Sequence, residues 1–143
     1  MKKVLVTSLL MVLTLSACKT TSTNPTTAPV VGPGYANTTD QNIGASLRAA
    51  RTFYRTIQCE MTGQNYQASS DQCVQDPNIT VPRVLSQTEK TAFNSLGAAL
   101  DIANPVYLAY HQGTATLAQA QAAADKVTPA LTQAQSTIVQ GVK

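Results

Sequence analysis

Apolar residues recur at spacings of three and four in three stretches of the chain, and each stretch predicts one amphipathic helix. The stripes of apolar residues begin at Ile43, Phe93 and Leu117. The predicted helices cover about residues 42–61, 87–112 and 115–140. Three such stripes can close around a shared core, and their 3,4 alternation favours nearly parallel or antiparallel packing. The sequence therefore predicts an all-α fold, a small antiparallel three-helix bundle that occupies residues 42–143.

Helix-capping residues support two of these boundaries. Ser86 is followed three residues later by Glu89, a capping box that opens the second helix. Thr116 and Gln119 repeat the pattern at the start of the third helix. Gly113 suits the left-handed residue that commonly ends a helix. The link between the second and third helices is therefore short, which makes them an antiparallel hairpin.

Two prolines interrupt the helical pattern. Pro105 lies inside the second helix, where a proline removes a backbone hydrogen bond and bends the helix. Pro129 either bends the third helix in the same way or, with Thr128 as its cap, is the first residue of a restarted helix. The apolar stripe continues past both prolines, so we expect two kinked helices rather than four short ones.

The first eighteen residues have a different pattern. Two lysines precede an apolar run over residues 4–15, and small residues follow just before Cys18. This order of positive, apolar and small segments is typical of a secretory signal peptide. The run is too short for a transmembrane helix, which needs about 20 predominantly apolar residues. An ordinary cleavage site is matched only loosely by Leu15-Ser16-Ala17.

The ending Leu15-Ser16-Ala17-Cys18 resembles the lipobox of bacterial lipoproteins. The resemblance implies that the signal peptide, residues 1–17, is removed, that a diacylglycerol is attached to the Cys18 thiol, and that the new amino group is acylated. Each buried methylene contributes about 0.8 kcal/mol, so several acyl chains would hold the protein on the cell membrane without help from the polypeptide. Beyond this motif, the chain resembles small helical lipoproteins of Gram-negative genomes and prophages in architecture alone.

The residue after the lipid cysteine bears on which membrane holds the protein. In lipoproteins of enteric-type Gram-negative bacteria, Asp at this place resembles an inner-membrane retention signal, and this chain has Lys19 there. The resemblance therefore implies the periplasmic side of the outer membrane if the host is Gram-negative.

Residues 18–41 form a segment rich in Thr, Pro, Gly and Asn with few large apolar side chains. Such a segment cannot offset the entropy lost on ordering. We therefore expect a lipidated cysteine followed by a flexible tether with an average reach of about 25–30 Å.

Cys59 and Cys73 remain as one pair once the lipobox resemblance has assigned Cys18 to lipid. In an oxidising periplasm we expect a disulfide between them, which pins the polar loop of residues 63–82 to the end of the first helix. A redox or metal site is the alternative. The spacing does not match Cys-x-x-Cys, and the single histidine cannot complete a zinc shell. We expect no metal, and no cofactor other than the covalent lipid.

The chain has ten Lys and Arg against seven Asp and Glu, but two of those lysines lie in the leader, so the mature protein is nearly neutral. It has no Trp and only two Phe, which argues against a nucleic-acid partner. Arg48, Arg51 and Arg55 lie on one face of the first helix. A solvated helix face is one interpretation of this arginine row. Contact with anionic headgroups or with an acidic partner is the sharper hypothesis.

No pattern of catalytic residues emerges from the sequence. His111 reads as a helix-end residue whose charge suits the helix dipole, without a nucleophile and carboxylate in a recognisable arrangement. Asp71 and Asp76 share a loop but read as turn formers rather than as a glycosidase pair.

The sequence as a whole predicts a membrane-anchored periplasmic lipoprotein that is not an enzyme and acts as an interaction protein of the cell envelope. The alternative is a structural envelope protein that self-assembles through its alanine-lined stripes. A cell-wall or ester hydrolase is a distant third.

Overall fold

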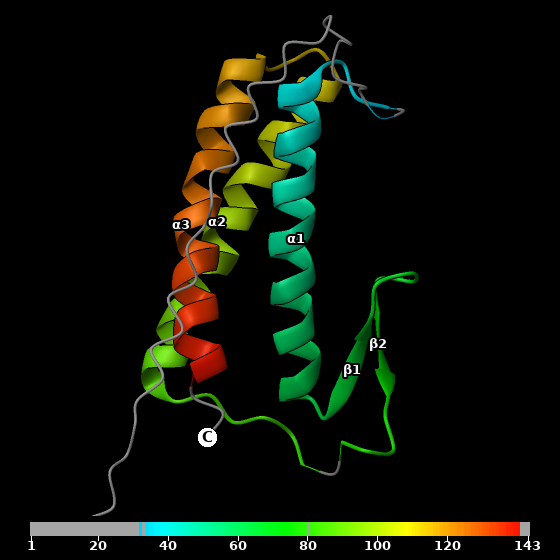
Figure 1. Cartoon of the computed structure of the whole chain (residues 1–143), viewed down its shortest axis with the longest axis vertical. Helices are drawn as coiled ribbons and strands as arrows, with labels where there is room; N and C mark the ends of the chain where they lie inside the picture. The colour runs from blue at the N-terminus through cyan, green and yellow to red at the C-terminus, as the bar shows by residue number, and fades with distance from the viewer. Residues whose placement is uncertain (1–31, 33, 80, 141–143) are drawn as a thin grey trace, which may run out of the picture.

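The computed structural model describes residues 32, 34–79 and 81–140 (Figure 1). Its elements in chain order are the helix α1 (Thr38–Met61), the strands β1 (Gln64–Gln67) and β2 (Gln72–Gln75), and the helices α2 (Gln87–His111) and α3 (Leu117–Gln140). Helices α1 and α3 run in the same direction and α2 runs in the opposite one (Figure 1). The predicted three helices are therefore present. The expected signal peptide, Cys18 and most of the tether lie outside the described residues.

Helix α1 begins earlier than the sequence predicted. The tether was expected to continue to residue 41, but α1 starts at Thr38. Asn37 caps it, because its side-chain oxygen accepts a hydrogen bond from the Asp40 N–H at 2.9 Å. This bond satisfies one of the backbone donors that a helix start leaves unpaired. The four residues before position 42 therefore belong to the bundle.

Helices α2 and α3 begin and end within two residues of their predicted bounds. The Ser86 hydroxyl accepts from the Glu89 N–H at 3.3 Å, and the Glu89 carboxylate accepts from the Ser86 N–H at 2.7 Å. Thr116 and Gln119 form the same reciprocal pair, at 3.2 and 2.8 Å. Gly113 has φ 74°, a backbone conformation that costs glycine little. Capping chemistry thus fixes both ends of the short α2–α3 link.

Each proline lies within a continuous helix. Helix α2 contains Pro105 and helix α3 contains Pro129, without an interruption in either. The restart at Thr128 that the sequence allowed does not occur. The expectation that the helices before and after the α2–α3 link are each continuous is confirmed.

The all-α prediction is incomplete, because an antiparallel hairpin follows α1. Strands β1 and β2 pair with Tyr66 opposite Cys73. The turn between them contains Asp71 at φ 54°, a left-handed conformation that Asp tolerates better than most residues. The expected disulfide joins Cys73 to Cys59 at the end of α1, with the two Cα atoms 5.3 Å apart. Both strands are four residues long and mostly polar, so they lack the alternating pattern by which a strand is recognised.

The core lies between the three helices and is closed by aliphatic side chains from each of them and by aromatic side chains from α1 and α2. Its fully buried members include Leu96, Val127 and Ile138. The most extensive contact joins α2 and α3. Helix α1 packs on this pair through Tyr54, whose ring stacks on that of Phe93 with centroids 4.3 Å apart. In the described part of the chain, no helix combines the length and apolar character needed to cross a membrane.

Candidate binding site on helix α1

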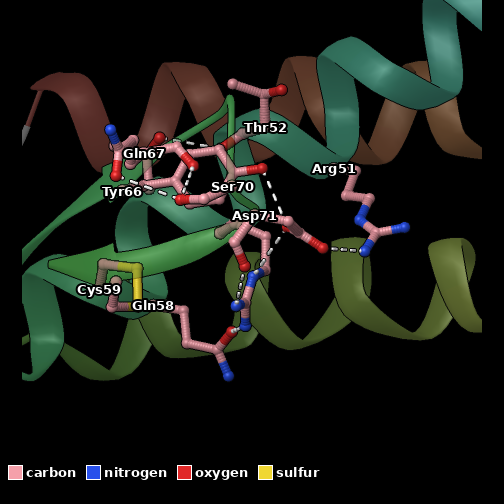
Figure 2. A network of polar contacts seen from close by, with 11 residues as sticks. Arg51, Thr52, Gln58, Cys59, Tyr66, Gln67, Ser70 and Asp71 are labelled. Carbon is pink, nitrogen blue, oxygen red and sulfur yellow. Dashed lines mark hydrogen bonds and ion pairs between the residues drawn. A yellow bond between two sulfur atoms is a disulfide. The ribbon is translucent and has the colours of Figure 1, made fainter.

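The arginine row lies on α1 as predicted, and the hairpin brings a carboxylate to it. Arg51 pairs with the Asp71 carboxylate (Figure 2). The Arg55 Nε atom lies 3.6 Å from an Asp71 carboxylate oxygen, and its Nη2 atom donates to the Asp71 carbonyl oxygen at 3.2 Å. Asp71 is a turn residue, as the sequence suggested, and also the counter-ion of two arginines, which the sequence did not reveal.

Tyr66 completes this network. Its hydroxyl donates to Asp71 at 3.0 Å. This hydrogen bond, together with the charges of Arg51 and Arg55, holds the pKa of Asp71 below its usual value despite some desolvation. Desolvation and the adjacent Asp71 carboxylate raise the pKa of Tyr66. The carboxylate is therefore ionised at neutral pH and balances charge on Arg51 and Arg55.

Arg48 differs from the other two members of the row. Its guanidinium donates to the Tyr35 hydroxyl and not to a carboxylate. Within the described residues it forms no ion pair, whereas Arg51, Arg55 and Arg83 each face a carboxylate. The hypothesis of an anionic contact therefore has its clearest candidate in Arg48.

An open groove of about 870 Å³ follows α1 from Gln41 to Glu60. Its central part is apolar, with Ala45, Ala49, Phe53 and Ile57 on α1, and Val139 of α3 lies towards the Arg83 end. Tyr35 and Arg48 line the groove towards the start of α1, and Arg83 and Glu60 line it towards the end. Nothing in the helical periodicity signalled this groove, because Arg83 and Val139 meet the α1 residues only in the folded bundle.

The start of α1 is fastened to the end of α2 by a cluster around Asp40, which is fully buried. Its carboxylate accepts hydrogen bonds from the Ala36 N–H and the Tyr107 hydroxyl, both at 2.8 Å, and lies 3.1 Å from the His111 Nε2 atom. Burial by itself raises the pKa of Asp40, but these partners outweigh it and hold the pKa below its ordinary value. Desolvation and the Asp40 carboxylate strongly raise the pKa of Tyr107.

His111 is the last residue of α2, as expected, but its contact with Asp40 was missed. The two residues are far apart in the chain, and the helical pattern gives no sign that they meet. Gly44 also belongs to this end of the bundle. A side chain there would lie 2.7 Å from both the Tyr107 hydroxyl and the Tyr35 ring.

At the other end of the bundle, Arg83 joins all three helices. Its Nη1 atom donates to Glu60 of α1 at 2.8 Å, and its Nη2 atom donates to the Ile138 carbonyl of α3 at 2.6 Å. The same Nη2 atom lies 3.6 Å from the Glu89 carboxylate of α2. The Arg83 N–H also donates to the Glu60 carbonyl at 2.8 Å. Arg83 thereby fixes the segment that leads from the hairpin into α2.

The residues around Arg83 remain exposed. Val81 and Val84 are 74% and 85% exposed, and Val139 at the end of α3 is 61% exposed. We call these three valines the valine end. It lies at the opposite end of the bundle from the start of α1 (Figure 1).

The alanine stripe of α3 is used inside the molecule. Ala120, Ala124 and Ala134 are buried against the other helices, so they are not free to contact a second copy. Helix α2 exposes two large apolar side chains, Ile102 and Leu108, and Ile102 borders a shallow hollow of about 550 Å³.

The described residues contain no group of three or more His, Cys, Asp and Glu side chains placed to hold a metal ion. Comparisons with known proteins give no match: no protein-family model, no curated protein and no solved structure is similar to this chain.

Proposed function

We propose that this protein is a lipid-anchored, non-enzymatic interaction protein of the bacterial cell envelope. The lipobox resemblance at Leu15–Cys18 supports a membrane anchor on the Cys18 thiol, and Lys19 supports the periplasmic side of the outer membrane. The bundle would then be carried at the end of a tether, with a binding surface directed towards a protein partner.

The valine end is the observation that carries this proposal. Arg83 points inward to Glu60 and Ile138, and the contacts of its backbone and side chain hold the flanking Val81 and Val84 on the surface. Apolar side chains that are exposed on a braced segment can bind a partner without a large loss of conformational entropy. Helix α1 begins at the other end of the bundle (Figure 1), so a tether that precedes it would let the valine end face away from the anchor.

Two experiments on the full chain test the proposal. For the anchor, cells that express the wild type or Cys18→Ala are labelled with a clickable palmitate, and the Cys18→Ala protein is expected to lose both the label and its membrane association. For the partner, a photoreactive amino acid replaces Val84 or, as a control, the exposed Thr114 at the other end of the bundle.

Irradiation of intact cells is expected to give one discrete crosslinked protein from position 84 and none from position 114. A Val81→Ser/Val84→Ser double variant should lose the protein that co-purifies with the wild type. Equal crosslinking from both positions, or palmitate labelling that survives in Cys18→Ala, would contradict the proposal.

Self-association is a second candidate, favoured by the exposed Ile102 and Leu108 of α2. Two differently tagged full-length copies should then co-purify, and Ile102→Glu/Leu108→Glu should abolish this co-purification without affecting the crosslink from position 84. Wild-type copies that do not co-purify would exclude this candidate.

A further inference from the structure

The groove along α1 is apolar in the middle and has different electrostatics at its two ends. Near the start of α1, Arg48 contributes a guanidinium that forms no ion pair with the described residues. Near the end of α1, the positive charge of Arg83 is balanced by Glu60 at 2.8 Å. A ligand that matches this surface needs one anionic group at a single end and an apolar body.

The dimensions of the groove favour a small ligand. Its volume of about 870 Å³ falls in the range of about 300–1,000 Å³ that is typical of small-molecule sites. Glu60 follows Arg48 by twelve helical positions, which is about 18 Å at the rise of an α-helix. This length is close to the thickness of one leaflet's hydrocarbon layer, about 15 Å, half of a bilayer core. A single acyl chain therefore matches the apolar length available.

Of the two threonines that line the groove, Thr56 does not oppose an alkyl chain. The Thr56 hydroxyl already donates to the Thr52 carbonyl at 2.8 Å, so covering it leaves no unpaired donor. Ala45 and Ala49 are small, which leaves room above the helix, while Phe53 and Ile57 provide larger apolar surface.

We infer that the groove along α1 binds a long-chain fatty acid. The carboxylate lies on the Arg48 guanidinium beside the Tyr35 hydroxyl, and the alkyl chain extends along Ala49 and Phe53 towards Val139. Carboxylates form their strongest hydrogen bonds with arginine. The inference does not depend on a protein partner at the valine end, and it assigns to Arg48 the anionic contact that the arginine row suggested.

The test uses the full-length protein reconstituted in phosphatidylcholine vesicles and a palmitic acid probe that carries a diazirine on its chain. After irradiation, the labelled residues are mapped by mass spectrometry. Labels are expected between Ala45 and Ile57 and at Val139. The matched diazirine alcohol, hexadecanol, partitions into the same vesicles without a charge and is expected to label these positions several-fold less.

Three variants test the contacts of the carboxylate and of the alkyl chain, and a fourth is the control. Arg48→Gln should lower palmitate labelling about threefold to tenfold, as expected for one charge-assisted contact at a partly exposed site, whereas Arg48→Lys should retain most of it. Ala49→Trp should block the apolar part and lower labelling by both probes. Lys126→Gln removes one positive charge elsewhere and should change nothing.

Thermal melting of each variant separates loss of the ligand from loss of the fold. The inference is overturned if palmitate labels are scattered over the molecule, or if the alcohol labels the groove as well as the acid. It is also overturned if folded Arg48→Gln protein is labelled as strongly as the wild type. Labelling that meets the expectations while position 84 captures no partner would support the groove and refute the protein-binding proposal.

Discussion

At the scale of single residues, the buried carboxylate of Asp40 needs the most compensation from its neighbours. A carboxylate that is fully removed from water is costly unless hydrogen bonds and opposite charge compensate it. Here the Ala36 N–H, the Tyr107 hydroxyl and His111 compensate it. Removing one of these partners should therefore cost more than the modest net value of an ordinary hydrogen bond.

Tyr107→Phe tests this expectation, because it deletes only the hydroxyl that donates to Asp40 at 2.8 Å. We expect the free energy of unfolding in urea to fall by about 1–2 kcal/mol at pH 7. Tyr110→Phe is the matched control, since the described residues show no hydrogen bond from its hydroxyl, and its unfolding should match the wild type. Equal stability of the two variants would mean that the Tyr107 hydroxyl contributes nothing.

The lowered pKa of Asp40 makes a second prediction, on pH. An ordinary value is 3.8, and the folded protein holds this pKa lower, so the unfolded chain takes up the proton first as the pH falls. The ionised carboxylate therefore stabilises the fold above about pH 4, and this contribution is lost over the acidic interval below it. Asp40→Asn should show a shallower loss of stability over this interval, as measured by urea unfolding at each pH. Parallel curves for the two proteins would refute this role of Asp40.

At the scale of elements, helix caps formed by neighbouring residues could be predicted from the sequence. Contacts between residues far apart in the chain mostly could not. Each of the caps at Ser86 and Thr116 depends on side chains within four consecutive residues. The starts of α2 and α3 could therefore be predicted from the sequence. The start of α1 was missed because Thr38 and Thr39 share the composition of the tether, although Asn37 is a good cap. In such a case, capping signals outweigh composition.

For the hairpin and the surface of α1, only part of the structure could be predicted from the sequence. The arginine row could be placed on one face from its spacing, but its counter-ion Asp71 comes from a turn whose two strands are short and polar. The pairing of Cys59 with Cys73 could be predicted, whereas the strand register that it supports could not. The groove and the contact of His111 with Asp40 depend on helix packing, which the periodicity of single helices does not determine.

The disulfide gives the prediction at this scale. Replacing Cys59 and Cys73 together by Ala frees a loop closed by residues 14 apart, and the chain-entropy model gives a loss of roughly 3 kcal/mol. We expect a lower melting temperature and early hydrogen exchange in β1 and β2, while α2 and α3 keep most of their protection. Wild-type protein in reductant should behave like the double variant. An unchanged melting temperature would show that the hairpin is held without the bond.

At the scale of the whole molecule, two clusters fasten α1 to the α2–α3 pair, one at each end. The Asp40 cluster joins the start of α1 to α2, and Arg83 joins the end of α1 to α2 and α3. Between them, α1 makes less extensive contacts than α2 and α3 make with each other. If α1 opens as a local unit before the α2–α3 pair, removing one cluster should loosen the end of α1 that it holds and leave the other end unchanged.

Arg83→Met tests this separation, because it keeps an apolar stem and removes the guanidinium that binds Glu60 and the Ile138 carbonyl. We expect a loss of about 1–3 kcal/mol, since partly buried acceptors lose a charged donor. Hydrogen exchange by mass spectrometry should become faster at the ends of α1 and α3 but not around Asp40. Arg48→Met, a similar change that leaves the Arg83 contacts intact, should leave exchange at the ends of α1 and α3 as in the wild type. If Arg83→Met accelerates exchange equally along α1, the bundle opens as a single unit and the two clusters are not independent.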